Sequence, residues 1–287
     1  MPCGIRPSNV RVCHFTTRAI FRRGGVNITR PNGRKCVFEF DTIFFRNTLS
    51  GMLSHFAFFF IMTASRVAGV AIPETSQQVV LVTSPGWGSS KATVRILSRT
   101  KHGWMQNGAA MDALTGRKGM AWGLGLHRIN AASPRKMEGD GRAPAGVFEF
   151  GTAFSQTPMQ LGVPCVTIGP SHEGVDDPDS RYYNRLIDRR TVAKPDWKTS
   201  EKLHGTPHYR LGIWVAHNPQ RQRGAGSCIY LHEWVGERDG TAGCTVLRHD
   251  DLLRVMTALK IDHHPVLVQF PESVAQEHLP ALIRACR

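Results

Sequence analysis

The run Cys228-Ile-Tyr-Leu-His-Glu-Trp234, which is followed by Thr241-Ala-Gly-Cys244, decides the fold predicted for this chain. The first segment is apolar on both faces, which is typical of a strand buried inside a β-sheet. The small residues at 241–243 then predict a tight turn. The pattern therefore predicts a strand that carries His232 and a turn that ends at Cys244, with the two side chains close together.

A helix is predicted over residues 250–260, directly after this turn. Asp250 offers a side-chain oxygen for the N-terminal cap. Apolar residues at helical spacing predict one stripe that faces the core, formed by Leu252, Val255, Met256 and Leu259.

Apolar or alternating runs elsewhere predict further strands, separated by loops rich in glycine and proline. They lie at residues 79–82, 92–98, 146–150, 211–216 and 265–270. The predicted class is therefore mainly β, with a few short helices. A chain of 287 residues with 41% hydrophobic content is long enough to bury one sizeable core.

Cys244 and His232 have the chemistry of a nucleophile and its base. A cysteine attacks as the thiolate, and its ordinary pKa of about 8.5 leaves little thiolate at neutral pH, so a nearby imidazole is the usual activator. Gly243 lacks a Cβ and is expected to adopt a backbone conformation closed to other residues. Its N–H and that of Cys244 would then point towards the oxygen of a tetrahedral intermediate. Together these residues predict an acyl-transfer site.

Two other interpretations of Cys244 stay open. A free cysteine is most often a small buried hydrophobe. The other is a structural zinc site, because four soft ligands stand at spacings near those of zinc motifs, at Cys228, His232, Cys244 and His249. On one strand, positions 228 and 232 would lie about 13 Å apart, which is too far for two ligands of one metal ion.

Several motifs, taken in order, resemble the catalytic domain of the L,D-transpeptidase family of the YkuD/ErfK type. The stretch Arg142-Ala-Pro-Ala-Gly-Val-Phe148 resembles its substrate-side motif, Thr/Ala-Pro-x-Gly-x-Phe, and the segment from His232 to Cys244 resembles its active-site motif. The predicted helix and closing strand follow in the same order. The resemblance covers about residues 77–271. It implies an L,D-transpeptidase-like β-sandwich in which a short helix follows the catalytic cysteine.

The active-site motif departs from the commoner family pattern at four positions. Glu233 follows the histidine, Thr241 replaces serine, Ala242 replaces a second histidine and Val246 stands where arginine is expected. The chain therefore resembles a divergent branch, for which the reaction class carries over better than the acyl acceptor.

The resemblance implies a cysteine-dependent L,D-transpeptidase that acts on peptidoglycan stem peptides through a thioester acyl-enzyme and needs no metal or cofactor. His232 would serve first as base and then as acid, and the main-chain carbonyl of Glu233 would orient it. Two alternatives stay open. One is a thiol hydrolase of the same fold that releases D-alanine or a wall-linked protein, and the other is a non-catalytic wall-binding module with structural zinc.

Candidate substrate contacts lie in or beside the matched motifs, at Trp122, His127, Asn184, Asn218 and Trp234. About two of the five are expected to touch substrate, because loops on a rigid sheet often carry binding groups. Thr241 is expected either to donate a hydrogen bond at the site or to form the turn.

Residues 52–71 have the short apolar core of a secretory signal peptide, followed by a cleavage site of small residues. Translation is therefore expected to start at Met52, with residues 1–51 as a disordered extension from an over-called start. Residues 72–287 would form the catalytic domain, exported to the periplasm or cell envelope of a bacterium and without a stable membrane span. The alternative for the apolar run is a buried core helix or a membrane anchor.

The formal net charge is +14, and residues 1–51 hold nine Lys/Arg against two Asp/Glu. No helix-turn-helix, zinc-finger or aromatic RNA-binding pattern accompanies this charge, so nucleic acid is not the expected partner. The rest of the basic charge fits an anionic cell-wall polymer or a solvated surface. The sequence leaves the oligomeric state and the third-position diamino acid of the substrate open.

Export would place four cysteines in oxidising surroundings, where Cys244 must stay out of disulfides to act as a nucleophile. A Cys228–Cys244 bridge would switch the enzyme off. Cys165 and Cys286 are expected either to pair or to be simply buried.

Overall fold

A computed structural model describes residues 20–29, 35–44, 70–128, 134–236 and 239–286. The chain divides into two compact units, Met1–Ala64 and Ser65–Arg287, each taken here by itself. The first unit contains an antiparallel hairpin of strands β1 (Ile20–Thr29) and β2 (Lys35–Phe44). This hairpin lies within residues 1–51, for which the sequence predicts disorder. Most of the expected signal peptide, including Met52, lies outside the described residues, so the start site and the signal stay predictions.

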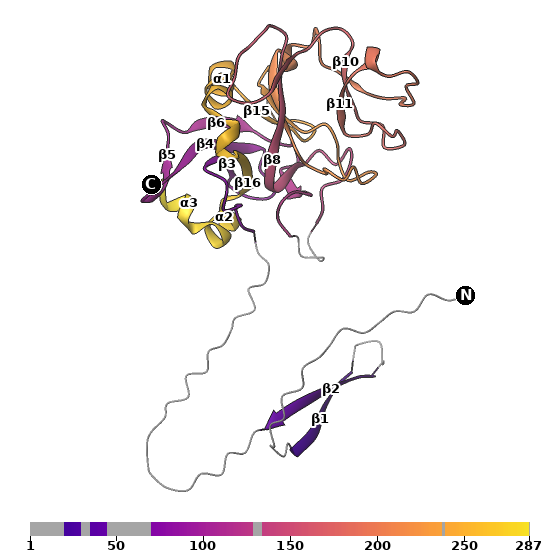
Figure 1. The fold of residues 1–287 in the computed structure, drawn as a ribbon, viewed down its shortest axis with the longest axis vertical. Helices are drawn as coiled ribbons and strands as arrows, with labels where there is room; N and C mark the ends of the chain where they lie inside the picture. The colour runs from indigo at the N-terminus through magenta and orange to yellow at the C-terminus, as the bar shows by residue number, and fades with distance from the viewer. Residues whose placement is uncertain (1–19, 30–34, 45–69, 129–133, 237–238, 287) are drawn as a thin grey trace, which may run out of the picture. The chain divides into compact units, whose positions relative to one another are not determined.

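The second unit, drawn in Figure 1, is built around eight strands. The pairing of β13 with β8 closes their hydrogen bonding into a ring. In ring order they are β13 (Leu211–Val215), β14 (Tyr230–Glu233), β15 (Thr245–Leu247), β6 (Met111–Leu114), β4 (Lys91–Thr100), β3 (Gln78–Ser84), β16 (Val266–Pro271) and β8 (Ala143–Ser155). Three short strands attach to this ring, namely β5 (Gly103–Gln106), β7 (Met120–Trp122) and β9 (Cys165–Thr167).

Strand β8 closes the ring because it is long enough to have two different partners. Gly146–Glu149 pair with β16, and residues 150–155 pair with β13. The mainly β class with few short helices is therefore confirmed. The expected sandwich of two separate sheets is wrong, because β8 joins what would be their free edges into one barrel.

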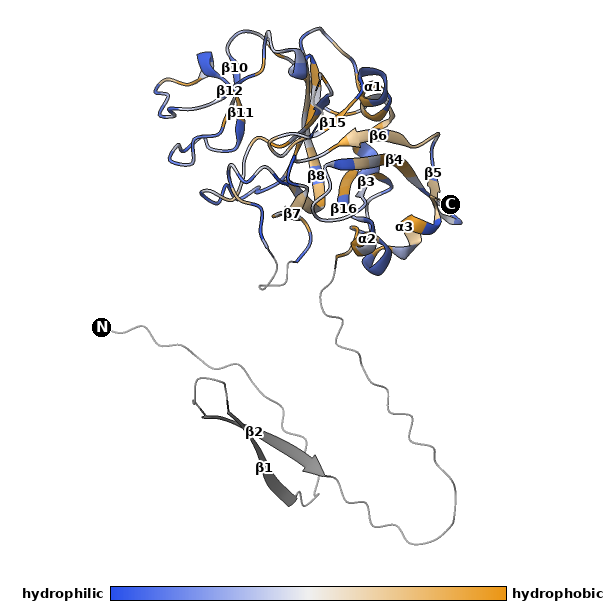
Figure 2. Ribbon diagram, turned by 180° about the vertical axis from the view of Figure 1, so that it is seen from behind, coloured by the Kyte–Doolittle hydropathy of each residue, from blue (hydrophilic) through white to orange (hydrophobic). Residues whose placement is uncertain are grey.

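The interior of the barrel is a continuous apolar core. Every residue of β3 is buried, as the unbroken apolar run at 79–82 predicts. In Figure 2 the hydrophobic colouring gathers on the barrel strands. Helices α2 (Glu272–His278) and α3 (Pro280–Arg284) follow β16 and contribute Ala275 and Leu282 to the same core.

The six strands expected from the sequence are all present, with one difference that matters for the site. Residue 228 does not belong to β14, which begins at Tyr230. Cys228 instead has a φ of 52°, in the left-handed region. The chain therefore bends sharply at Cys228 before it enters the strand.

The predicted helix is present as α1 (His249–Ala258), and it buries Leu252, Val255 and Met256 as expected. The N-terminal cap is different. Arg248 occupies the cap position without a side-chain hydrogen bond, so Asp250 is not the cap. Asp250 and Asp251 lie in the first turn, where their charges favour the positive end of the helix dipole.

A segment between β8 and β13 forms a second, small sheet with the order β11 (Arg185–Asp188), β10 (His172–Val175) and β12 (Glu201–Lys202). Figure 2 shows this region in mostly hydrophilic colours beside the barrel. It is followed by the 3-10 helix η2 (Pro207–Tyr209), which leads into β13. No helix in the described part of the chain is long and apolar enough to cross a membrane.

Candidate active site

Cys244 lies directly before β15, which runs parallel to β14. The position opposite Cys244 in the neighbouring strand is that of Tyr230. The N–H of Tyr230 donates to the Sγ of Cys244 at 3.3 Å, and this thiol donates to the carbonyl of Cys228 at 3.4 Å. The bend at Cys228 therefore provides the acceptor that orients the thiol.

His232 lies two residues beyond Tyr230 on β14 and pairs with Val246. Alternate residues of a strand share a face, and residues paired across parallel strands point the same way. His232 and Cys244 consequently face the same side of the barrel wall, about two residues or 7 Å apart along the strands. This register agrees with the proximity of His232 and Cys244 that the sequence pattern predicts.

The backbone next to His232 fixes the orientation of its ring. Nδ1 lies 3.0 Å from the carbonyl oxygen of Glu233. Because a carbonyl only accepts, Nδ1 carries the hydrogen in this contact, and a neutral ring then accepts a proton at Nε2. The main-chain contact expected at Glu233 is present.

The carboxylate of Glu233 serves a different purpose. It is buried and accepts from Nε of Arg210 at 2.7 Å, and its other oxygen lies 2.6 Å from Nδ1 of His249 at the start of α1. Glu233 therefore ties β14 to the segment before β13 and to α1.

Thr241 builds the turn that presents the thiol. Its hydroxyl donates to the carbonyl of Cys244 at 2.6 Å and accepts from the N–H of Gly243 at 3.0 Å. Of its two expected roles, the turn-forming one is the one that the contacts support.

The role predicted for Gly243 is corrected in two respects. Its N–H already has Thr241 as partner, so it does not point towards an oxyanion. Its φ is not in the left-handed region either. Glycine is needed here for close approach instead, since a Cβ would lie 3.1 Å from the carbonyl oxygen of Arg142. Of the two amides predicted to face an oxyanion, only the N–H of Cys244 stays a candidate.

The thiol is covered. Cys244 is 7% exposed and packs in a cluster with Phe154, Tyr230 and Leu203, against which Tyr209 also packs. Burial raises the pKa of Cys244 far above its ordinary value, and the charge of Glu201 raises it further. The thiol is therefore protonated at rest, and attack requires a base.

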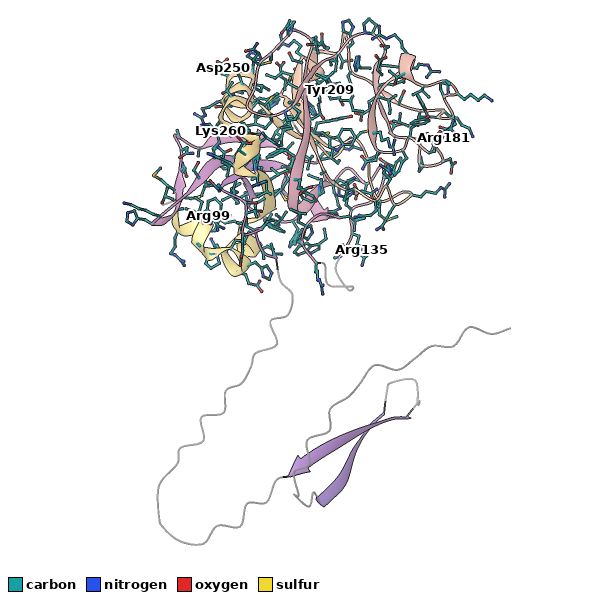
Figure 3. The ribbon with its side chains drawn as sticks, in the orientation of Figure 1. Arg99, Arg135, Arg181, Tyr209, Asp250 and Lys260 are labelled. Atoms are coloured by element: carbon teal, nitrogen blue, oxygen red, sulfur yellow. The ribbon has the colours of Figure 1, made fainter. Side chains whose placement is uncertain are left out.

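Two residues of the cover were not anticipated from the sequence. The hydroxyl of Tyr209 donates to the carboxyl of Glu201 at 3.0 Å, and the ring centroid of Tyr209 lies 5.1 Å from that of His232 (Tyr209 is labelled in Figure 3). Burial raises the pKa of Glu201 to about 7. Both residues come from the segment between β8 and β13, and neither Glu201 nor Tyr209 belongs to a motif quoted from the sequence.

Three of the predicted substrate contacts are parts of the scaffold. His127 is buried and accepts at Nδ1 from the N–H of Val147 at 3.0 Å. Asn184 accepts from the N–H of Cys228 at 3.0 Å and donates to two loop carbonyls, which helps to hold the bend before β14. Asn218, fully buried, organises its own loop by donating to the carbonyls of Gln222 and Gly226. Their polar groups face the protein, so they are not placed to meet a ligand.

The other two are partly exposed and stay candidates. Trp122 and Trp87, with ring centroids 5.5 Å apart, line a cavity of about 290 Å³ together with Met137 and Arg142. Trp234 follows β14, and the guanidinium carbon of Arg248 lies 5.8 Å from its ring centroid. That two of the five contact substrate stays a prediction.

All four cysteines of the described barrel unit are free, so Cys165 and Cys286 do not pair. No group of three or more His, Cys, Asp or Glu side chains within the described ranges is arranged to hold a metal ion. Of the four zinc ligands considered, His249 contacts Glu233, whereas the Cys244 thiol contacts the Cys228 carbonyl. The geometry gives no support to the zinc alternative.

No model of a known protein family, no curated protein and no solved structure matches this chain. Its function is therefore inferred from its motifs and from the geometry around Cys244.

Proposed function

We propose that this chain is a cysteine-dependent L,D-transpeptidase that acts on peptidoglycan stem peptides. The observation that carries the proposal is the position of His232 on β14 beside the turn that ends at Cys244, directly before the parallel strand β15, with Nδ1 of the histidine held by the Glu233 carbonyl. The order of motifs along the chain supports the same reaction. In this proposal the barrel unit is a divergent L,D-transpeptidase-like domain, exported to the periplasm or cell envelope.

The first half of the reaction forms an acyl-enzyme. Nε2 of His232 takes the proton of the Cys244 thiol, and the thiolate attacks the carbonyl carbon of the third residue of a stem peptide. The N–H of Cys244 stabilises the resulting oxyanion. The imidazolium then returns its proton to the nitrogen of the departing D-alanine, and a thioester remains on Cys244.

The second half transfers the acyl group. The side-chain amine of a neighbouring stem attacks the thioester and loses a proton to His232, and the Cys244 sulfur leaves and is reprotonated. The products are a crosslink between two third-position residues and the original thiol. The apolar cover of Leu203, Phe154 and Tyr230 favours transfer to an amine over hydrolysis, because it limits the access of bulk water to the thioester.

Mass spectrometry of the products tests this proposal. Wild-type protein and Cys244→Ala are each incubated with a disaccharide-tetrapeptide muropeptide. The expected result is a dimer that lacks one D-alanine and forms only with the wild type. Tripeptide monomers without dimers would make the protein a carboxypeptidase. Unchanged substrate in both samples would contradict the proposed reaction.

A further inference from the structure

Lys136 is a buried lysine beside the turn that carries the proposed nucleophile. Its side chain is only 3% exposed, which is rare for lysine because a buried ammonium is costly without partners. The side chain passes two glycines: a Cβ at Gly226 would lie 3.1 Å from its Cγ, and a Cβ at Gly243 would lie 3.5 Å from its Cε. The chain thus makes room for this lysine next to Cys244.

The ammonium of Lys136 is held in place from one side. It donates to the carboxylate of Asp140 at 2.6 Å and to the carbonyl of Met137 at 2.7 Å. Asp140 also accepts from the N–H groups of Met137 and Arg142, both at 2.9 Å, so the loop at 136–142 is one hydrogen-bonded unit. An ammonium has three N–H groups, and the described residues provide acceptors for two of them.

The charges around Cys244 explain why a cation is needed there. Tyr209, Tyr230 and Cys228 pack in one cluster with Cys244, and Glu201 on β12 accepts a hydrogen bond from Tyr209 and acts on the thiol through its charge. His232 provides the base from β14. Burial and the charge of Glu201 raise the pKa of Cys244, whereas the Tyr230 N–H and the charge of Lys136 lower it. On its other side Lys136 faces Asp140 and His217.

As a step that rests on the proposed function and deepens it, we propose that Lys136 is a positioning residue for the reaction. Its ammonium fixes a positive charge at the Gly243–Cys244 turn and so stabilises the thiolate that attacks and the oxyanion that follows. Lys136 keeps its own proton throughout, and the thiol proton goes to His232. The effect is large because charges interact more strongly in a buried site than in water.

Two substitutions with opposite effects on charge test this role. Lys136→Met keeps the apolar stem but removes the cation, and Asp140→Asn keeps the lysine but removes its counter-charge. The rate of Cys244 alkylation by iodoacetamide is followed against pH by mass spectrometry. Because burial places the midpoint far above neutral pH, the rates are compared below it, where they are proportional to the thiolate fraction. We expect Lys136→Met to slow alkylation about tenfold, which corresponds to a pKa of Cys244 about one unit higher. Asp140→Asn should speed alkylation.

The matched control is Lys101→Met, which removes the same charge from an exposed turn and should leave the alkylation rate unchanged. If the salt bridge between Lys136 and Asp140 had only a structural role, both variants would show similar defects, and their effects on Cys244 alkylation would not be opposite. That result would overturn the proposal. If thermal unfolding shows that Lys136→Met is not folded, the test rests on the change in Cys244 alkylation in Asp140→Asn. The absence of that change would count against the role proposed for Lys136. Alkylation needs no peptidoglycan, so a failure of the proposed reaction would be visible separately.

Discussion

At the scale of single residues, the Thr241 hydroxyl is the contact that shapes the nucleophile turn. It is buried and links the Gly243 N–H to the Cys244 carbonyl. Thr241→Val keeps the shape but removes both hydrogen bonds, so we expect the free energy of unfolding to fall by about 1–3 kcal/mol. The dependence of the Cys244 alkylation rate on pH should also differ from that of the wild type. Thr241→Ser keeps the hydroxyl and is the control, with both properties near wild type. Urea unfolding and alkylation rates measure the two effects, and equal behaviour of the Val and Ser variants would refute this role.

At the scale of elements, helix η2 covers the thiol through Tyr209. Removal of this ring in Tyr209→Ala should make local opening easier by at least about 1.4 kcal/mol and speed Cys244 alkylation about tenfold or more. Tyr209→Phe keeps the ring and loses only the hydrogen bond to Glu201, so its alkylation rate should stay close to that of the wild type. The comparison is made at one pH with both variants folded, as judged by circular dichroism. An unchanged rate in Tyr209→Ala would mean that reagents reach the thiol by another route.

Helix η2 is one of the features of the fold that could not be predicted from the sequence. The local pattern of apolar residues predicts strands such as β3 and β16 and the buried stripe of α1. In each case the pattern itself indicates which side chains are buried. The His232–Cys244 juxtaposition could also be predicted, since it depends on two segments that lie close in sequence. Ring closure through β8 and the cover by η2 could not, because both depend on pairing between distant segments. Lys136 lies before the motif that begins at Arg142, and its burial beside Gly243 is visible only in three dimensions.

At the scale of the whole barrel unit, two carboxyl groups of the small sheet make opposite contributions to stability against pH. Burial raises the pKa of Glu201 to about 7, so the folded state binds its proton more tightly than the unfolded state, and stability falls as pH rises from about 4.5 to about 7.

Burial would also raise the pKa of Glu173, but hydrogen bonds from Lys202, Ser200 and Arg189 outweigh it and lower that pKa to about 2. Glu173 therefore stabilises the fold above about pH 4.5, and this contribution is lost as pH falls towards 2. Glu201→Gln should consequently raise the free energy of unfolding by about 3 kcal/mol at about pH 8 and leave it unchanged at about pH 4. Glu173→Gln should lower it at about pH 8, and this loss should shrink as the pH falls below about 4. Guanidinium unfolding across this range measures both differences, and a Glu201→Gln difference that does not vary with pH would show that the pKa of Glu201 is the same in the folded and unfolded states.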